Sequence, residues 1–203
     1  SNTGAVEFVG TGNRVLTLAG NSTGDNELRP LLGDNPNGGV LSVVKSGTGQ
    51  WVLSGSNTFS GILSVLGGVL QAKDGVGLSG SSNLFLNGGV FQTEGLFKRV
   101  LGTGTGQVQI GAGGGGFAAS GSALKVNLGG TLSLAGSLFL VAPNSPGDVD
   151  FQSAIDLGSS GVRTVFVDDN PNTGFDFATI SGTVFGGTAM VKAGPGNLLL
   201  TGR

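Results

Sequence analysis

Aspartates beside turn signals are the residues of this sequence best placed to do chemistry. They form two groups, Asp148 with Asp150, and Asp168 with Asp169 and Asp176. Two carboxyl groups facing one another across a bound sugar can hydrolyse a glycosidic bond. Both groups adjoin Pro, Gly or Asn turn residues, where carboxylates are ordinarily solvated. Polysaccharide lyase chemistry would also need a basic residue facing bound calcium, and Lys98-Arg99 is the only adjacent basic pair. The sequence therefore predicts no convergent catalytic set.

Other reactive side chains are missing or unmarked. The sequence has no His, Cys or Tyr, which excludes imidazole and thiolate catalysis, disulfides and zinc sites of the usual kind. Serines and lysines are present, but a nucleophile needs a positioned base and an oxyanion site, and no motif marks either. Gly111–Gly116 lacks the Gly-Lys-Ser/Thr ending of a phosphate loop, which leaves a flexible or close-packed corner. We predict a protein that is not an enzyme, with no catalytic, cofactor-binding or metal-binding residues and no cofactor.

Two loops share the pattern D-N-P-N-x-G, beginning at Asp34 and at Asp169. Oxygen-rich loops can hold calcium, but proline occupies the third position of both, and the first loop contains no further acid. The two copies also stand at different offsets from the nearest lysines, Lys45 and Lys192. Asn-Pro-Asn turns account for both loops without a metal, and calcium binding at either loop stays an open alternative.

Charge and hydropathy exclude several classes of partner. Ten basic residues stand against twelve acidic ones, and the formal net charge is −2, so no basic groove for nucleic acid is expected. The longest apolar run, Leu138–Ala142, is far too short to span a bilayer, and we expect no membrane insertion by this segment. The chain opens on Ser1 without a charged-then-apolar leader, so we expect a mature or excised fragment.

Glycine spacing predicts an all-β chain. The 42 glycines recur every few residues, and no long stretch keeps a helical apolar pattern without one. Short alternating runs, such as 15–18, 50–53, 107–110 and 164–167, are separated by Gly-Gly, Asn-Gly and Gly-Ser breaks. Strands this short and this regularly separated are typical of a sandwich, a barrel or a solenoid.

Internal repetition favours the solenoid. Residues 44–55 and 191–202 share the pattern V-K-x-G-x-G-x-(W/L)-(V/L)-L-(S/T)-G, and strands beginning at Arg14 and Arg163 precede the two copies at similar distances. One long unit, from Lys45 to Lys192, therefore repeats. With a coil of roughly 20 residues, the chain would form about 9 or 10 coils, or about 45 Å of rod.

The segment from Lys45 to Ala72 resembles the passenger-associated β-strand repeat of bacterial autotransporters. The family pattern K-x-G-x-G-x-(W/L)-x-L-(S/T)-G-x-N-T-(Y/F)-x-G is matched here, with Phe59 in the aromatic position, and the copy at Lys192 is similar up to Arg203. The resemblance implies a right-handed parallel β-helix displayed outside the cell. We expect one continuous β-solenoid over residues 1–203, a fragment of a longer array, with signature repeats at 44–72 and 191–203.

Alternation within the repeat predicts which side chains fill the interior. The predicted inward residues are Trp51, Leu53, Phe59, Ile62, Val65 and Leu70. Asn57 is expected at a corner, where its side chain bonds neighbouring backbone or stacks on an asparagine of the next coil.

The leading functional prediction is a non-enzymatic extracellular scaffold segment of a large autotransporter-like surface or secreted protein, a stiff spacer or a fibre-forming rod. An adhesin-type segment that binds carbohydrate or host protein is the first alternative, and a clustered aromatic or acidic stripe would favour it. A polysaccharide-active enzyme is the second, and it requires converging carboxylates. The expected partners are neighbouring repeats of the same polypeptide, and we also expect end-to-end self-association through unpaired strand edges. The expected location is extracellular or at the cell surface.

Overall fold

A computed structural model describes residues 4–24, 26–174 and 177–202 of the chain. The strands are β1 Arg14–Leu18, β2 Asn26–Leu28, β3 Leu41–Lys45, β4 Gln50–Leu53, β5 Leu63–Val65, β6 Val69–Ala72, β7 Leu84–Leu86, β8 Val90–Lys98, β9 Val108–Ile110, β10 Gly115–Asn127, β11 Leu132–Ser133, β12 Leu138–Leu140, β13 Asp148–Phe151, β14 Ile155–Asp156, β15 Val162–Val167, β16 Phe177–Ile180, β17 Val184–Phe185, β18 Ala189–Ala193 and β19 Asn197–Leu200. Within these described ranges there is no helix that could cross a membrane.

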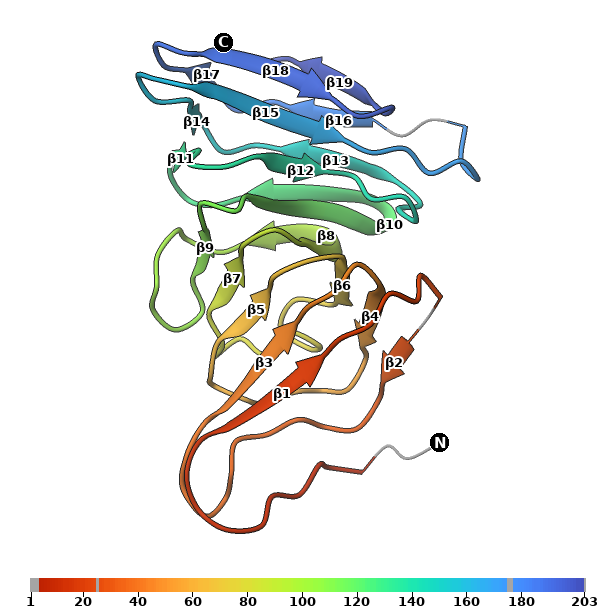
Figure 1. Ribbon diagram of the computed structural model, residues 1–203, viewed down its shortest axis with the longest axis vertical. Coiled ribbons are helices and arrows are strands. Elements are labelled where there is room, and N and C mark those ends of the chain that lie inside the picture. The colour runs from red at the N-terminus through yellow and green to blue at the C-terminus, as the bar shows by residue number, and fades with distance from the viewer. Residues whose placement is uncertain (1–3, 25, 175–176, 203) are drawn as a thin grey trace.

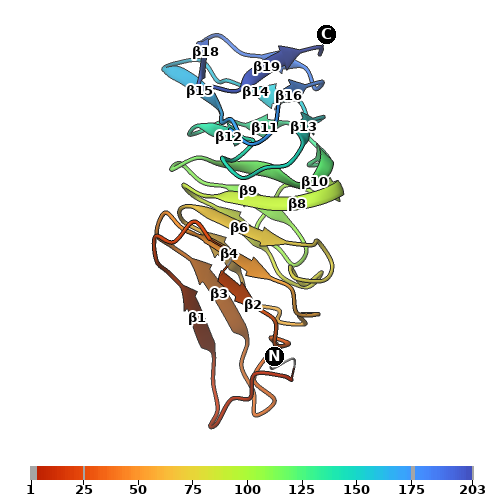
Figure 2. The ribbon, with the colours of Figure 1, turned by 90° about the vertical axis from the view of Figure 1, so that its right-hand side faces the viewer.

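The strands form parallel ladders along one axis (Figures 1 and 2). One sheet has the order β1-β3-β5-β7-β9, and a short one has the order β11-β14-β17. The largest sheet runs β2-β4-β6-β8-β10-β12-β15-β18, and β13, β16 and β19 extend it from the second half of β10. Each strand pairs with strands of the neighbouring coils, as the chain climbs from the red N-terminal end to the blue C-terminal end in Figure 1. The predicted all-β parallel solenoid is confirmed.

Several coils are longer than the sequence predicted. Gln50 pairs with Val69, a step close to the predicted coil, but the step from Val149 to its partner Ala178 is much longer. The solenoid therefore makes about seven turns instead of the nine or ten predicted. The extra residues lie in loops between strands, such as residues 168–174 between β15 and β16, and lengthen a coil without adding height.

A continuous apolar core lies inside the coils. Phe91, Phe97, Phe117 and Phe151 are fully buried, and the ring centroids of successive members lie 5.1 to 6.4 Å apart. Such offset aromatic contacts add to the burial of apolar area that drives the coils together.

Most of the predicted interior of the repeat is confirmed. The side chains of Leu53, Phe59, Val65 and Leu70 are buried. Trp51 packs against the core but is half-buried, and its indole Nε1 donates to the Ala19 carbonyl at 3.0 Å.

The prediction for Ile62 is wrong, since its side chain is 43% exposed. Strand β5 begins one residue later, and its buried positions are Leu63 and Val65. A one-residue slip in a strand exchanges the inward and outward faces, so Ile62 points to solvent.

Amide side chains join successive coils at the corners. Asn57 is buried; its Oδ1 accepts the Leu32 amide hydrogen at 2.9 Å, and its Nδ2 donates to the Gly77 carbonyl at 2.7 Å. These bonds tie Asn57 to the coil below and to the coil above, which confirms its predicted corner position.

A buried lysine occupies the corner after β3. Lys45 is 0% exposed, and its Nζ donates to the carbonyls of Ser46, Gly47 and Gly67, each at 2.9 Å. Gly47 and Gly67 belong to successive coils, so the ammonium group bridges them. Gly47 has φ +73°, and a Cβ there would lie 2.6 Å from the Gly20 carbonyl oxygen, so this corner requires glycine.

The two signature copies lie on different faces of the solenoid. Lys45 ends β3 in the five-stranded sheet, and β4 of the largest sheet follows. Lys192 lies in β18 of the largest sheet, and β19 follows in line with β13 and β16. Each copy consists of a strand, a glycine corner and another strand. The copy at Lys45 begins in the five-stranded sheet, whereas the copy at Lys192 begins in the largest sheet, which is the next face along the coil. The separation of the copies is therefore not a whole number of turns.

Candidate functional site

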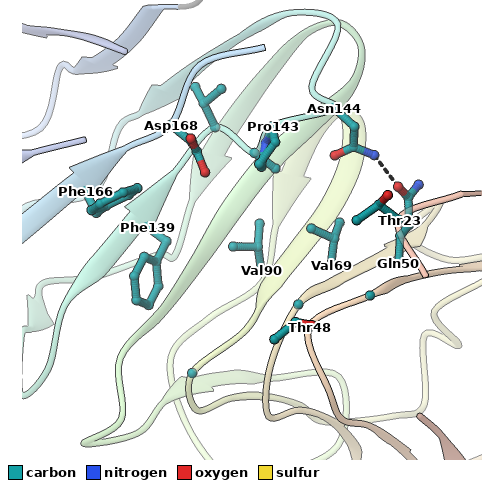
Figure 3. A pocket seen from close by; sticks show the side chains of 15 residues that line it. Thr23, Thr48, Gln50, Val69, Val90, Phe139, Pro143, Asn144, Phe166 and Asp168 are labelled. Atoms are coloured by element: carbon teal, nitrogen blue, oxygen red, sulfur yellow. Dashed lines mark hydrogen bonds between the residues drawn. The ribbon is translucent and has the colours of Figure 1, made fainter. Parts of the chain in front are cut away.

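A groove of about 290 Å³ lies on the outward side of the largest sheet (Figure 3). Its lining comes from several coils and from the loop after β12. The lining residues are Thr23, Thr48, Gly49, Gln50, Gly68, Val69, Gly88, Val90, Phe139, Val141, Ala142, Pro143, Asn144, Phe166 and Asp168. Because these residues are far apart in sequence, only the stacking of coils brings them together.

The floor of the groove follows one ladder position repeated along the axis. Each member pairs with the next in register, in the order Gln50, Val69, Val90, Gly116, Phe139 and Phe166. The flanking Leu138 and Leu140 of β12 are buried, so the alternation of the strand turns Phe139 outward. The Phe139 and Phe166 rings meet edge to face with centroids 6.2 Å apart. Of these ladder residues, Val69, Val90, Phe139 and Phe166 form an apolar floor that includes an aromatic pair, and the buried Gln50 marks its β4 end.

Residues 141–147, called the strap here, form one wall of the groove. The amide of Val141 donates to the Phe117 carbonyl at 3.1 Å. Ser145 is fully buried, and its Oγ bonds the carbonyls of Ala119 at 2.9 Å and Gly147 at 3.0 Å. The strap is thus tied to the sheet beneath it.

Val141 adopts a left-handed backbone with φ +66°, and it is the one non-glycine residue with positive φ among those that the structure describes. A β-branched residue is rarely found there, and such strain costs of order 1–3 kcal/mol. Val141 is also buried at 2% exposure, so packing holds it in this conformation. The strap, and with it this wall of the groove, therefore begins with a strained residue.

Asn144 links the strap to distant coils. Its Nδ2 donates to the Oε1 of Gln50, which lies in β4, four strands from β12 in the sheet order. The same Nδ2 lies 3.4 Å from the Oε1 of Gln92. The Nε2 of Gln92 in turn donates to the Ala119 carbonyl at 2.9 Å. This amide network covers the sheet beside the groove and fixes the strap's position.

One charged side chain lines the groove. Asp168 follows β15, and its Oδ1 accepts the amide hydrogen of Asp169 at 3.0 Å. Figure 3 shows its carboxylate between Phe166 and Pro143, directed into the groove. The lining contains no Lys or Arg, so the electrostatic field there disfavours anions.

The other predicted acids do not join Asp168. Asp148 and Asp150 lie on β13, where Asp148 Oδ1 accepts the Phe177 amide hydrogen at 3.1 Å. Asp150 accepts hydrogen bonds from Gln152 at 3.0 Å and Ser181 at 2.5 Å. Asp169 is exposed, and Asp176 lies outside the described residues. No group of three or more acidic side chains able to hold a metal ion occurs in residues 4–24, 26–174 and 177–202.

The first D-N-P-N loop is held by its own polar groups. The Asp34 carboxylate accepts hydrogen bonds from the Leu41 amide at 2.8 Å and from the Ser60 amide and hydroxyl at 3.0 and 2.6 Å. Partial burial disfavours the charged carboxylate, but these bonds outweigh it and hold the pKa of Asp34 below its usual range. Asn35 closes the turn by accepting the Asn37 amide hydrogen at 3.0 Å.

Each loop also reaches the coil below through its first asparagine. Asn35 Nδ2 donates to the Gly10 carbonyl at 2.9 Å, and Asn170 Nδ2 donates to the Ser145 carbonyl of the strap at 2.9 Å. Asn170 accepts the Asn172 amide hydrogen at 3.0 Å in the matching turn. The predicted Asn-Pro-Asn turns are confirmed, and they connect coils.

The basic pair is divided between surface and interior. Lys98 is exposed. Arg99 is buried and donates to the Asp74 carboxylate at 2.9 and 2.6 Å and to the carbonyls of Ser82 and Ser79 at 2.6 and 3.0 Å. All of these contacts are structural, and none places a base near the groove.

The aromatic pair and the strap were not predicted from the sequence. Two short signals mark them. The triplets Leu138–Leu140 and 165–167 each place phenylalanine between two aliphatic residues, and Pro143-Asn144-Ser145-Pro146 interrupts the alternation. Neither signal says that the two triplets stack in register.

Comparisons with known proteins agree with the repeat pattern. The family described as passenger-associated-transport-repeat matches residues 43–72. Over 90 residues the chain is 37% identical to the adhesin BmaC autotransporter of Brucella suis biovar 1, an alignment that covers 40% of this chain. It covers only 3% of that relative, so this chain spans a small fraction of the relative's length. No solved structure matches the chain significantly. The resemblance predicted from residues 45–72 is confirmed.

Proposed function

We propose that this chain, which carries a passenger-associated-transport-repeat at residues 43–72, is a stiff extracellular segment of an autotransporter passenger. The observation that supports the proposal best is the uninterrupted parallel ladder from β2 to β18. Every coil is hydrogen-bonded to the next over a shared apolar core, so bending the rod would break contacts along one side. The segment acts as a spacer that holds other parts of the passenger at a fixed distance.

A non-enzymatic role fits the distribution of acids. Asp148 and Asp150 bond to neighbouring backbone and side chains on β13, whereas Asp168 lies in the groove beside β15. Hydrolysis of a glycosidic bond requires two carboxyl groups on opposite sides of the bond. The described residues offer the groove one carboxylate.

Adding coils tests the spacer role. Residues 63–83 are one coil, because Leu63 pairs with Leu84 and Val69 pairs with Val90 at the same separation along the chain. Four further copies of 63–83 inserted after Asn83 would extend the rod by about 19 Å, at about 4.8 Å per coil. Small-angle scattering should show this added length with an unchanged cross-section.

An insert of the same composition with a scrambled order is the matched control, and it should enlarge the cross-section or unfold. If the ordered insert also widened the molecule or left its length unchanged, the spacer proposal would be wrong.

A second candidate role is adhesion. The groove and its aromatic pair are the observation that favours it, and the relative in Brucella suis is described as an adhesin. In this role the rod presents the groove to a ligand outside the cell.

A further inference from the structure

We infer that the groove beneath the strap binds a neutral, linear oligosaccharide. The inference rests on the adhesive role proposed above and names its ligand class. It joins three features of the groove, namely its axial shape, its apolar floor with an aromatic pair, and its polar rim without a cation.

The shape favours an extended ligand. The floor follows one ladder position from Val69 to Phe166 through four inter-strand steps. At about 4.8 Å per step this path is about 19 Å long. It runs along the rod's axis on the outer side of the largest sheet, so a chain of several monomer units can lie along it.

The floor suits the apolar faces of pyranose rings. Val69 and Val90 are half-buried and contribute aliphatic surface, and Phe139 and Phe166 contribute aromatic surface. The negative face of an aromatic ring attracts positively polarised C–H groups. Binding sites of this kind pair an apolar lining with a few polar groups that fix the ligand's orientation.

The rim supplies those polar groups. Asp168 can accept hydrogen bonds from sugar hydroxyls, and the exposed hydroxyl of Thr23 can donate to them. The Thr48 hydroxyl donates to Asn21 Oδ1 at 3.2 Å and can accept a hydrogen bond from a sugar. The Asn144 oxygen is turned away from Gln50 in Figure 3 and is a further acceptor. Because the lining has a carboxylate and no Lys or Arg, uronic acids, sialic acids and sulfated sugars are disfavoured.

The strap, which forms one wall of the groove, is held in place before a ligand binds. Val141 is held in a strained conformation, and Asn144 is bonded to Gln50 across four strands. Backbone strain that packing maintains is concentrated at binding and catalytic sites, and a fixed wall lowers the entropic cost of binding.

Titration calorimetry of the whole chain with cellohexaose, fully N-acetylated chitohexaose, mannohexaose and a galacturonate hexamer tests the inference. We expect binding to at least one neutral hexamer and none to the galacturonate hexamer. Phe166→Ala and Asp168→Asn should each weaken binding at least about tenfold. The controls are Phe185→Ala, which truncates an exposed phenylalanine on β17, and Asp169→Asn. Both controls should stay within about twofold of the parent chain.

Three results would overturn the inference: binding of the galacturonate hexamer alone, equal losses in groove and control variants, or no binding of any neutral hexamer. Groove-dependent attachment of the intact passenger to cells without neutral-hexamer binding would leave the adhesive role standing and reject only the ligand class. Circular dichroism melting of each variant shows whether a loss of binding reflects unfolding.

Discussion

Replacing Lys45 with methionine tests how the repeat holds its coils together. The Lys45 ammonium group is buried and bonded to three carbonyls, each at 2.9 Å. Methionine keeps most of the side chain's volume but donates no hydrogen bond, so all three carbonyls lose a partner. Gly47 is exposed, and water can replace the lysine there, whereas Ser46 and Gly67 are half-buried.

An unsatisfied buried acceptor costs about 1–3 kcal/mol, and half-burial places the two affected carbonyls in the lower part of that range. We therefore expect Lys45→Met to reduce the free energy of unfolding by about 2–4 kcal/mol. Equilibrium unfolding in guanidinium chloride measures this change. Lys125→Met, which removes an exposed lysine of β10, is the matched control and should change stability by less than about 0.5 kcal/mol.

The pH dependence of folding stability provides a second, independent test of the role of Lys45. Burial lowers the pKa of Lys45 below its usual value of 10.5. The folded state then binds this proton less tightly than the unfolded chain, so stability rises with pH between the lowered pKa and 10.5. The methionine variant lacks this group, and the stability gap between parent and variant should widen from neutral pH toward pH 10.5. A gap below about 0.5 kcal/mol, or one that narrows as the pH rises, would refute the reasoning.

Three other predictions concern the strap, the sheet and the rod's end. Gly116→Ala would drive a Cβ into the Phe139 carbonyl oxygen and should destabilise by about 2 kcal/mol or more, whereas Gly130→Ala, with open space around it, should be nearly neutral; chemical denaturation compares them. Val141→Gly relieves backbone strain, so it should cost about 1–3 kcal/mol less than Val165→Gly, a change at a buried strand position with ordinary φ. Strands β18 and β19 lie at the edge of the described ladder, and we propose that they pair with a second copy; sedimentation velocity should show association that grows with concentration, and a clean monomer at high concentration would contradict it.

Local chemistry was enough to predict the strands and the corners of a coil, but not the length of each coil. Glycine corners, short alternating strands and the position of Asn57 depend on neighbours within one coil or the next, and a sequence pattern records those neighbours. The misplaced Ile62 shows the limit of alternation. Strand β5 begins at Leu63 because its pairing partner is Val43 of the coil below, and a pattern with a period of two residues does not determine that starting point.

Stacking between coils of unequal length could not be read from the sequence. Phe139 and Phe166 meet because the coil between them is longer than the coil that brings Gln50 to Val69. A fixed coil of about 20 residues, the sequence-based expectation, would not have placed these two phenylalanines in register. The error in the number of turns and the failure to find the groove therefore have the same cause, which is variable loop length.

The glycine run shows how one residue type serves both the rod and the groove. Gly111–Gly116 was predicted to be a flexible or close-packed corner, and its last two residues open strand β10. Gly116 lies in register between Val90 and Phe139, where any side chain would collide with the next strand. Its lack of a side chain lets β10 and β12 stack closely, and Val90 and Phe139 on either side of it in the ladder both line the groove. A substitution at Gly116 should therefore disturb both the stacking of the coils and the spacing of the residues that line the groove.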